Sequence, residues 1–314
     1  MDFDLETEIE RCIPSSFPKE SVKTALNYKP TENDLFIVSY PKCGTTWTQQ
    51  IVYLLLNSGQ PPDKTILFSK SIPFLEFCEP KPRLPEETEL RVFKTHLPFH
   101  LIPFNSNSKY IYCVRNPKDC CVSFWYHERD FPLLNCQDFN QFFQLFINGK
   151  TGYGHYFDHL LGWLQEKHRN NILVVQFEDL KNKFESELKR IANFISNDLL
   201  SRLNSDHKFR ENVIKFSSFE FMRNTTNKQM ESFFNMSAEE LRSDEQIVNK
   251  FKEAFSHIKE TAEVRIAPEV NFVRKGIIGD FKTHLTDEQN ILLNDKIKDK
   301  LQSFPELYNK WISI

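Results

Sequence analysis

The chain has 314 residues, of which 40% are hydrophobic and 26% charged, and its formal net charge at pH 7 is −3. A chain of this length can bury a substantial core, and its small net charge gives no reason to expect nucleic acid or an anionic membrane as a partner. The N-terminus is acidic without an apolar signal region, and no apolar run is long enough to span a bilayer. The seven cysteines have no metal-ligand spacing, so we expect a reduced, cytoplasmic protein without a metal.

Four short runs rich in β-branched and aromatic residues predict strands, at residues 35–39, 91–96, 109–115 and 171–177. Three of them are almost continuously apolar, as is typical of strands covered on both faces. Helical patterns occupy residues 45–57, 117–127, 137–148, 153–168 and 180–196. This alternation predicts an α/β fold, in which a central, mostly parallel sheet carries helices on both faces.

The segment 225–270 is more polar and charged than the rest of the chain. Within it, Ser237 and Glu240 fit a capping box at the start of a helix. We therefore expect a helical insertion that caps the α/β body over the ligand site, within a single domain of residues 1–314. A second capping box, beginning at Thr286, predicts a C-terminal helix.

The stretch SYPKCGTTW joins the first predicted strand to the first predicted helix. A helix N-terminus offers unpaired N–H groups and partial positive charge, so it favours an anion. Gly44 lets the backbone approach a ligand, Thr45 and Thr46 add hydroxyls, and Lys42 adds a positive charge. Trp47 presents a flat face suited to a nucleobase. The stretch predicts a P-loop-like anion site, although an ordinary capped turn with Trp47 in the core would have the same pattern.

Lys94 and His96, in the stretch FKTHLP, alternate along the second predicted strand, so both side chains project from the same side. A histidine that titrates near neutral pH can act as a general base, and a neighbouring lysine stabilises developing negative charge. A surface pair at a strand end is the alternative. Taken alone, the pair does not predict catalysis.

Two further segments carry groups that suit phosphate. Arg115 ends the third predicted strand and Ser123 lies in the helix that follows, and the planar arginine fork binds phosphate at two points. In the stretch FVRKGIIGDFK, Arg274 and Lys275 precede Gly276, whose backbone can supply donors. A structural ion pair and an exposed basic loop are the respective alternatives. Ligands of parallel sheets bind at the carboxyl ends of the strands, so we expect these groups to converge there.

Together, these segments resemble the signature segments of the cytosolic sulfotransferase family, in the same order along the chain. The segments are SYPKCGTTW, FKTHLP, YIYCVRNPKDCCVS and FVRKGIIGDFK. The resemblance covers roughly residues 30–224 and 271–290. It implies transfer of a sulfonate group from 3′-phosphoadenosine 5′-phosphosulfate (PAPS) to a hydroxyl or amine of a small apolar acceptor such as a phenol, steroid or alcohol. The product nucleotide would be adenosine 3′,5′-bisphosphate, and no metal is required.

The resemblance also implies where the nucleotide binds. The 5′-phosphosulfate would be held by the first loop, at Lys42, Cys43, Gly44, Thr45 and Thr46. The adenine would lie among Trp47, Phe177, Ser218, Phe219 and Met222. The 3′-phosphate would be bound by Arg115, Ser123, Arg274, Lys275 and Gly276.

For the chemistry, the resemblance implies that His96 is the general base, while Lys94 and Lys42 stabilise the transferring sulfonate and the leaving phosphate. Ser123 completes the predicted catalytic set. Phe74 and Phe142 align with positions that line the acceptor pocket in the family.

The chain also departs from the family. Cys43 stands where a serine is usual, and Phe177 stands where a tyrosine often contacts adenine. The family's short dimer motif has no clean match before Arg274, so the sequence does not predict whether the chain forms a homodimer. A P-loop nucleotide kinase is one alternative function, although the motif G-x-x-x-x-G-K-[ST] is absent. A non-catalytic nucleotide-binding protein is the other, and the identity of the acceptor is not predicted.

Overall fold

The structure is a computed structural model. It describes residues 4–62, 71–77, 89–130, 136, 138–237, 239–240 and 271–314. Most of the predicted cap, from residue 241 to residue 270, lies outside the described residues. The predicted capping box within this segment is formed, because the Ser237 N–H donates to Glu240 Oε2 at 2.6 Å and the Glu240 N–H donates to Ser237 Oγ at 3.1 Å.

The core of the fold is a sheet of four parallel strands in the order β2-β1-β3-β4. The strands are β1 (Asp34–Ser39), β2 (Arg91–Thr95), β3 (Lys109–Val114) and β4 (Ile172–Gln176). All four predicted strands are confirmed, each within one residue of its predicted ends. Because β2, β1 and β3 are neighbours, their carboxyl ends lie side by side, which is where the sequence placed the ligand groups.

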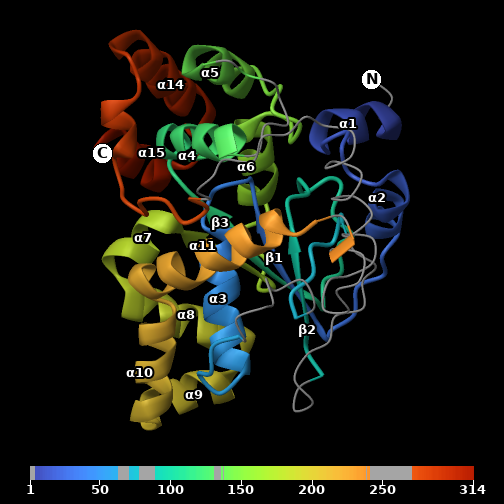
Figure 1. The fold of residues 1–314 in the computed structure, drawn as a ribbon, viewed down its shortest axis with the longest axis vertical. Coiled ribbons are helices and arrows are strands. Elements are labelled where there is room, and N and C mark those ends of the chain that lie inside the picture. The colour runs from blue at the N-terminus through green and yellow to red at the C-terminus, as the bar shows by residue number, and fades with distance from the viewer. Residues whose placement is uncertain are drawn as a thin grey trace.

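Helices cover both faces of the sheet, as predicted (Figure 1). One face carries α1 (Leu5–Cys12), α2 (Lys19–Leu26), α4 (Pro117–Asp130), α5 (Phe139–Ile147), α6 (Tyr156–Leu164), α14 (Asp287–Lys300) and α15 (Pro305–Ile312). The other carries α3 (Thr45–Leu56), α8 (Phe184–Ile195), α9 (Asn197–Ser205) and α10 (His207–Phe216). Along β1, Phe36 and Val38 pack into the first core and Leu35 and Ile37 into the second, so the period of two explains the continuously apolar sequence.

Three further elements complete the described fold, namely α7 (Phe177–Asn182), α11 (Phe219–Asn235) and the 3₁₀ turn η1 (Asp280–Thr283). The predicted helix 180–196 is wrong as a single element, because it breaks at Lys183, whose ψ of 44° is not helical. The sequence has no glycine or proline to mark this break. The capping box at Thr286 is confirmed at the start of α14. Among the described residues, no helix is long and apolar enough to cross a membrane.

Asp34 fixes the start of β1 from a fully buried position. Its carboxylate accepts hydrogen bonds from Arg91 Nε at 2.7 Å, the Thr31 N–H at 2.7 Å and the Tyr28 hydroxyl at 3.0 Å. These contacts join the first strand to β2 and to the loop after α2.

The Asp34→Ala variant should therefore lose roughly 2–4 kcal/mol of the free energy of unfolding, because it leaves these donors without their shared acceptor. Urea denaturation would measure the loss. The matched control is Glu20→Ala, which removes only an exposed pair with Lys23 at 3.9 Å and should change stability by less than about 0.5 kcal/mol. Equal effects of the two substitutions would contradict a structural role for Asp34.

Candidate functional site

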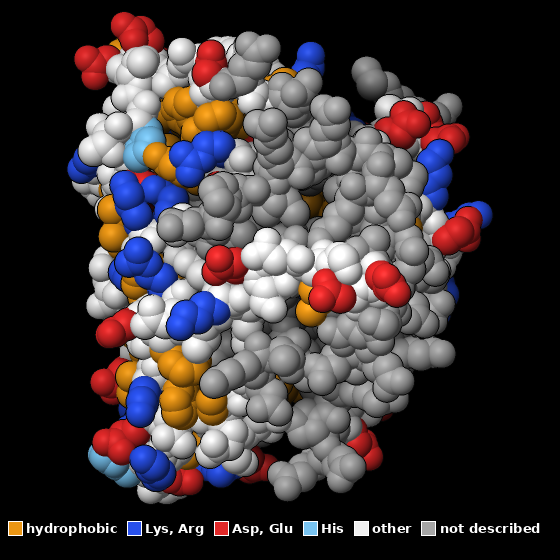
Figure 2. Space-filling view, in the orientation of Figure 1, with side chains coloured by type: hydrophobic (Ala, Val, Ile, Leu, Met, Phe, Trp, Pro, Cys, Tyr) orange, Lys and Arg blue, Asp and Glu red, His pale blue; other side chains and the backbone are white. Residues whose placement is uncertain are grey.

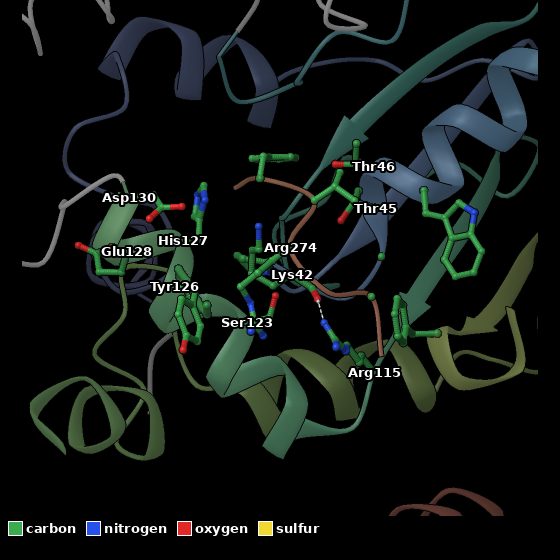
Figure 3. Close-up of a pocket in the computed structure, with 18 of the residues that line it drawn as sticks. Lys42, Thr45, Thr46, Arg115, Ser123, Tyr126, His127, Glu128, Asp130 and Arg274 are labelled. Atoms are coloured by element: carbon green, nitrogen blue, oxygen red, sulfur yellow. Dashed lines mark hydrogen bonds between the residues drawn. The ribbon is translucent and has the colours of Figure 1, made fainter. Parts of the chain in front are cut away.

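A cavity of about 340 Å³ lies at the carboxyl ends of the central strands (Figure 3). All four predicted motifs contribute residues to its lining. The predicted residues that line it are Lys42, Gly44, Thr45, Thr46, Trp47, Phe74, Lys94, His96, Arg115, Ser123, Phe177, Phe219, Met222, Arg274, Lys275 and Gly276. The predicted residues Cys43, Ser218 and Phe142 are not part of the lining. The expected convergence of distant segments is therefore present.

The loop between β1 and α3 is shaped by two residues with positive φ. Lys42 has φ 68° and Gly44 has φ 100°. The φ of Gly44 favours glycine, and a Cβ there would also crowd the Phe177 ring at 3.2 Å. The helix begins at Thr45, and its first N–H groups have no partner within the helix. The Cys43 side chain is buried, lies 3.7 Å from the Cys120 sulfur and does not line the cavity.

Lys42 reaches into the centre of the cavity, with its Nζ 4.4 Å from the centre of the Phe272 ring (Figure 3). Burial lowers the pKa of Lys42 to about 7, and the nearby charges of Lys94 and Arg115 contribute to the shift. The side chain is thus partly neutral at neutral pH, and an anion beside it would restore its charge.

His96 follows the last residue of β2 and is buried. Its Nδ1 lies 2.7 Å from the Ser39 carbonyl oxygen, which can only accept, so Nδ1 carries the proton and Nε2 of the neutral ring has a free lone pair. Burial, and then the charge of Lys94, lower the pKa of His96 well below its ordinary value. The Lys94 ammonium lies 4.2 Å from the centre of the Phe74 ring. The arrangement presents a neutral base beside a cation.

Arg115 is buried at the end of β3, stacked over the Phe177 ring at 4.2 Å. Its guanidinium donates to the backbone oxygens of Lys42 at 3.3 Å and Ile277 at 3.2 Å. Arg115 Nε is buried with no hydrogen-bond partner among the described residues. A buried donor without a partner is costly, and an anion in the cavity would supply one.

Arg274 and Lys275 are held by a single carboxylate. Asp280 is buried and pairs with Arg274 Nη2 and with Lys275 Nζ, the latter at 2.7 Å. Burial alone would raise the pKa of Asp280, but the hydrogen bonds from Lys275 and Arg274 outweigh it and lower that pKa. Arg274 also stacks on the Tyr126 ring at 4.1 Å, and its buried Nη1 has no partner among the described residues. Asp280 therefore orients both cations without satisfying every donor.

The backbone that follows these cations is fixed by α4. Asp119 accepts from the Gly279 N–H at 2.8 Å and from the Phe281 N–H at 3.1 Å. Gly276 has φ 58°, and a Cβ there would lie 2.6 Å from the Phe219 ring. Glycine is thus needed at position 276 for the loop to close against α11.

On the side of α3, aromatic residues form the wall. Trp47 is half-buried, donates from Nε1 to the Ser217 carbonyl at 2.8 Å and stacks on Phe184 with ring centres 5.9 Å apart. It lines the cavity, so it is not a purely internal core residue. The Ser218 hydroxyl accepts from the Phe221 N–H at 3.3 Å and acts as a helix cap.

The opposite end of the cavity is partly polar, which the sequence analysis missed. Phe74 lines it, whereas Phe142 is fully buried and packs behind Phe124, a lining residue. His127 and Asp130 lie on α4 four and seven residues after Ser123, so the helical period itself places them on the same face. The other lining residues that the motifs did not indicate include Pro14, Ser15, Ser16, Glu128, Thr151, Gly152, Tyr153 and Lys181.

Away from the cavity, Glu8, Cys12 and His100 hold their potential ligand atoms within 4.8 Å of one another. Glu8 already accepts from Arg11 at 2.8 Å, and a guanidinium at this distance opposes a metal cation. The basic side chains on the described part of the surface in Figure 2 form separate groups rather than one continuous patch.

The model of the sulfotransferase domain family matches residues 32–263, which is most of the chain. The chain belongs to the sulfotransferase family. Mouse sulfotransferase 2A6 is 31% identical over 299 residues, and the match covers 93% of each protein. The guinea pig 3-alpha-hydroxysteroid sulfotransferase is 28% identical, with 89% of this chain and 88% of the relative covered.

Among solved structures, mouse sulfotransferase SULT7A1 complexed with PAP has a TM-score of 0.65 over 96% of both chains. At 22% identity this likeness shows that the sulfotransferase fold is shared. The family match ends before Arg274. In this sulfotransferase, hydrogen bonds from the third motif hold the fourth motif at the site: Arg115 donates to the Ile277 carbonyl, and Asp119 accepts from the Gly279 N–H.

If Asp280 orients the basic loop, residues 274–281, the Asp280→Asn variant should expose the peptide bonds after Arg274 and Lys275 to trypsin. We expect cleavage there to become at least about 5-fold faster, because loss of a charged partner destabilises the segment by roughly 1–3 kcal/mol. Mass spectrometry of a digestion time course would measure the rates. Asp295→Asn, at an exposed position on α14, is the control and should leave them unchanged. An unchanged rate in Asp280→Asn would show that Asp280 does not hold the loop.

Proposed function

We propose that this sulfotransferase transfers a sulfonate group from PAPS to the hydroxyl of a small apolar acceptor, with His96 as general base. The observation that carries the proposal is a pair of buried guanidinium nitrogens, Arg115 Nε and Arg274 Nη1, that have no hydrogen-bond partner among the described residues and belong to side chains lining the same cavity as Lys42. Such an excess of buried positive charge needs a multiply charged anion to offset it. PAPS carries anionic groups on both its 5′ and 3′ sides.

The first loop provides the proposed 5′ site. The N-terminus of α3 supplies N–H groups and partial positive charge, and the hydroxyls of Thr45 and Thr46 lie beside them. Lys42 lines the same cavity and would stabilise negative charge as it develops on the leaving phosphate. Since the Cys43 side chain does not line the cavity, a cysteine in place of the family's serine is compatible with binding.

The proposed 3′ site combines Arg115 and Ser123 with Arg274, Lys275 and Gly276. Arg115 is already oriented by the carbonyl oxygens it contacts, and the Asp280 carboxylate orients the other two cations. The donors are thus arranged before the ligand binds, which reduces the entropy cost of binding. The complex of mouse SULT7A1 with PAP supports a nucleotide of this kind in the shared fold.

The adenine would occupy the aromatic wall between these two sites. Trp47, Phe177, Phe219 and Met222 line the cavity there. Phe177 offers a ring without a hydroxyl, and the Arg115 guanidinium stacks on that ring. We therefore expect adenine binding to depend on stacking and packing.

The proposed chemistry uses groups that need little rearrangement. When bound, PAPS supplies an activated sulfonate whose bond to the 5′-phosphate oxygen breaks as the acceptor oxygen bonds to sulfur. His96 Nε2 would take the acceptor's proton, since the Ser39 carbonyl holds Nδ1 in its protonated form. Lys94 would stabilise charge on the transferring group, and Ser123 belongs to the same proposed set.

The acceptor would lie beyond His96, against Phe74, Phe124 and Tyr153. The Phe74 and Tyr153 rings both meet the His96 ring edge-on, at 5.1 and 5.6 Å. Flat aromatic walls suit a phenol or a steroid, and the name of the guinea pig relative supports the latter class. Phe142 would act only indirectly, by supporting Phe124. The single-domain organisation with a cap at residues 225–270 remains part of this proposal.

The deciding experiment is a labelled-PAPS transfer assay against phenols, steroids, aliphatic alcohols and amines. We expect transfer to at least one apolar alcohol or phenol, and a loss of at least about 100-fold in kcat for His96→Ala, because the general base is removed. Equilibrium binding of adenosine 3′,5′-bisphosphate is the control and should be nearly unchanged in this variant. No transfer by the wild type, with nucleotide binding intact, would support the non-catalytic alternative. Transfer from ATP with Mg²⁺ instead would support the kinase alternative.

Lys42 gives a pH-dependent prediction. Its pKa is about 7 in the free protein, and an anionic nucleotide beside it should raise that pKa, so binding at pH 7.5–8 should take up protons and weaken as the pH rises. Calorimetry in buffers of different ionisation enthalpy would measure the uptake. Lys42→Met should bind more weakly and lose most of the uptake, whereas Lys181→Met, at the cavity edge, should retain it. Equal uptake in wild type and Lys42→Met would exclude Lys42 as the group that titrates.

A further inference from the structure

The backbone pairing between β2 and the segment beside it stops just before His96, the proposed base. Within residues 71–77, Phe74 forms an isolated parallel bridge with Lys94 of β2. The Lys94 N–H donates to the Pro73 carbonyl at 2.9 Å, and the Leu75 N–H donates to the Lys94 carbonyl at 2.8 Å. This is the regular pattern of a parallel pair.

At the next position the pattern changes. Regular pairing would join the His96 N–H to the Leu75 carbonyl, but the edge segment turns, with the Phe77 N–H donating to the Phe74 carbonyl at 2.9 Å. The Glu76 carboxylate takes over instead, and its Oε1 accepts from the His96 N–H at 2.7 Å. The Glu76 side chain thus provides the hydrogen-bond acceptor for the His96 N–H that the neighbouring backbone no longer provides.

Glu76 is one of three groups that fix His96. The His96 carbonyl accepts from His159 Nε2 at 3.1 Å, and the imidazole Nδ1 donates to the Ser39 carbonyl at 2.7 Å. Without Glu76, the buried His96 N–H would lose its acceptor, and the residue would be held from two sides only. The direction of Nε2 depends on all three contacts.

Burying the Glu76 carboxylate costs free energy that side-chain packing alone does not offset. It is 2% exposed, does not line the cavity, and its Oε2 has no hydrogen-bond partner among the described residues. Burial raises its pKa to about 7, although the His96 N–H, the Thr95 side chain and the charge of Lys94 act in the opposite direction. Burying a carboxylate in this way destabilises the fold, so its benefit lies in what it holds.

We infer that Glu76 is a positioning residue for sulfonate transfer. Its carboxylate accepts a hydrogen bond from the His96 backbone N–H and so directs the imidazole Nε2 toward the acceptor hydroxyl. The inference rests on the proposed role of His96. In the transfer step the acceptor's proton goes to His96 Nε2. Glu76 receives no proton and contacts neither substrate.

The test compares Glu76→Gln with Glu76→Leu in the labelled-PAPS assay. The glutamine keeps an acceptor oxygen, so its kcat should stay within about 3-fold of wild type. The leucine removes the acceptor, and its kcat should fall about 10–100-fold, because small displacements of a reacting group cost this much. KM for PAPS and affinity for adenosine 3′,5′-bisphosphate should change by less than about 3-fold in both. Glu76→Asp, with a retracted carboxylate, replaces the leucine variant if that one does not fold, and should lose kcat with the same unchanged affinity.

Repeating the substitution in a His96→Ala background separates positioning from structural damage. If Glu76 acts through His96, adding Glu76→Leu should not reduce the residual rate further. A further loss, a Gln variant as impaired as the Leu variant, or a Leu variant with wild-type kcat would each overturn the inference while leaving the proposed function intact. If His96→Ala keeps wild-type turnover, the base assignment fails and the inference with it. Absence of any transfer by the wild type is a failure of the proposed function itself.

Discussion

The rest of this structure depends on gathering like charges in a buried cavity. Lys42, Lys94 and Arg115 repel one another there, and the pKa of Lys42 near 7 reflects both its burial and that repulsion. A flexible chain would relieve the strain by moving the cations into solvent. The parallel sheet prevents this, because strands β1, β2 and β3 deliver their carboxyl ends to one place and helices cover both faces.

Buried carboxylates hold this cationic site in place without neutralising most of it. Glu76 accepts the N–H of His96, Glu178 accepts the N–H of Asn116 at 2.8 Å, next to Arg115, and Asp119 accepts N–H groups of the basic loop. Each of these carboxylates accepts hydrogen bonds from the backbone N–H groups of a segment that carries a site residue, rather than pairing with a cation of the site. Asp280 is the exception, since it pairs directly with two cations. Because most of these carboxylates bind backbone groups, the cavity keeps the positive charge that attracts an anion while its walls stay fixed.

The sequence predicted the features that depend on local patterns. Strand positions followed from short apolar runs, and the convergence of the motifs followed from the rule that parallel strands end at one edge. What depends on distant pairs was missed: Glu76 looks like an ordinary polar residue until its carboxylate is found beside His96. The break at Lys183 has no glycine or proline to announce it, and Phe142 was assigned to the acceptor pocket although Phe124 stands between it and the cavity. His127 and Asp130 were within reach of the sequence, because they repeat the helical spacing of Ser123.

The same electric field links the two proposed steps. Burial, and then the charge of Lys94, keep the pKa of His96 low and the ring neutral, and Lys42 makes a smaller contribution. An anionic donor beside Lys42 and Lys94 would offset that field, so it would raise the pKa of both Lys42 and His96. The nucleotide would then restore the full charge of Lys42 and at the same time make His96 a stronger base. On the proposed function, the base therefore reaches its working strength only after the donor is bound, which protects the empty site from unproductive proton transfer.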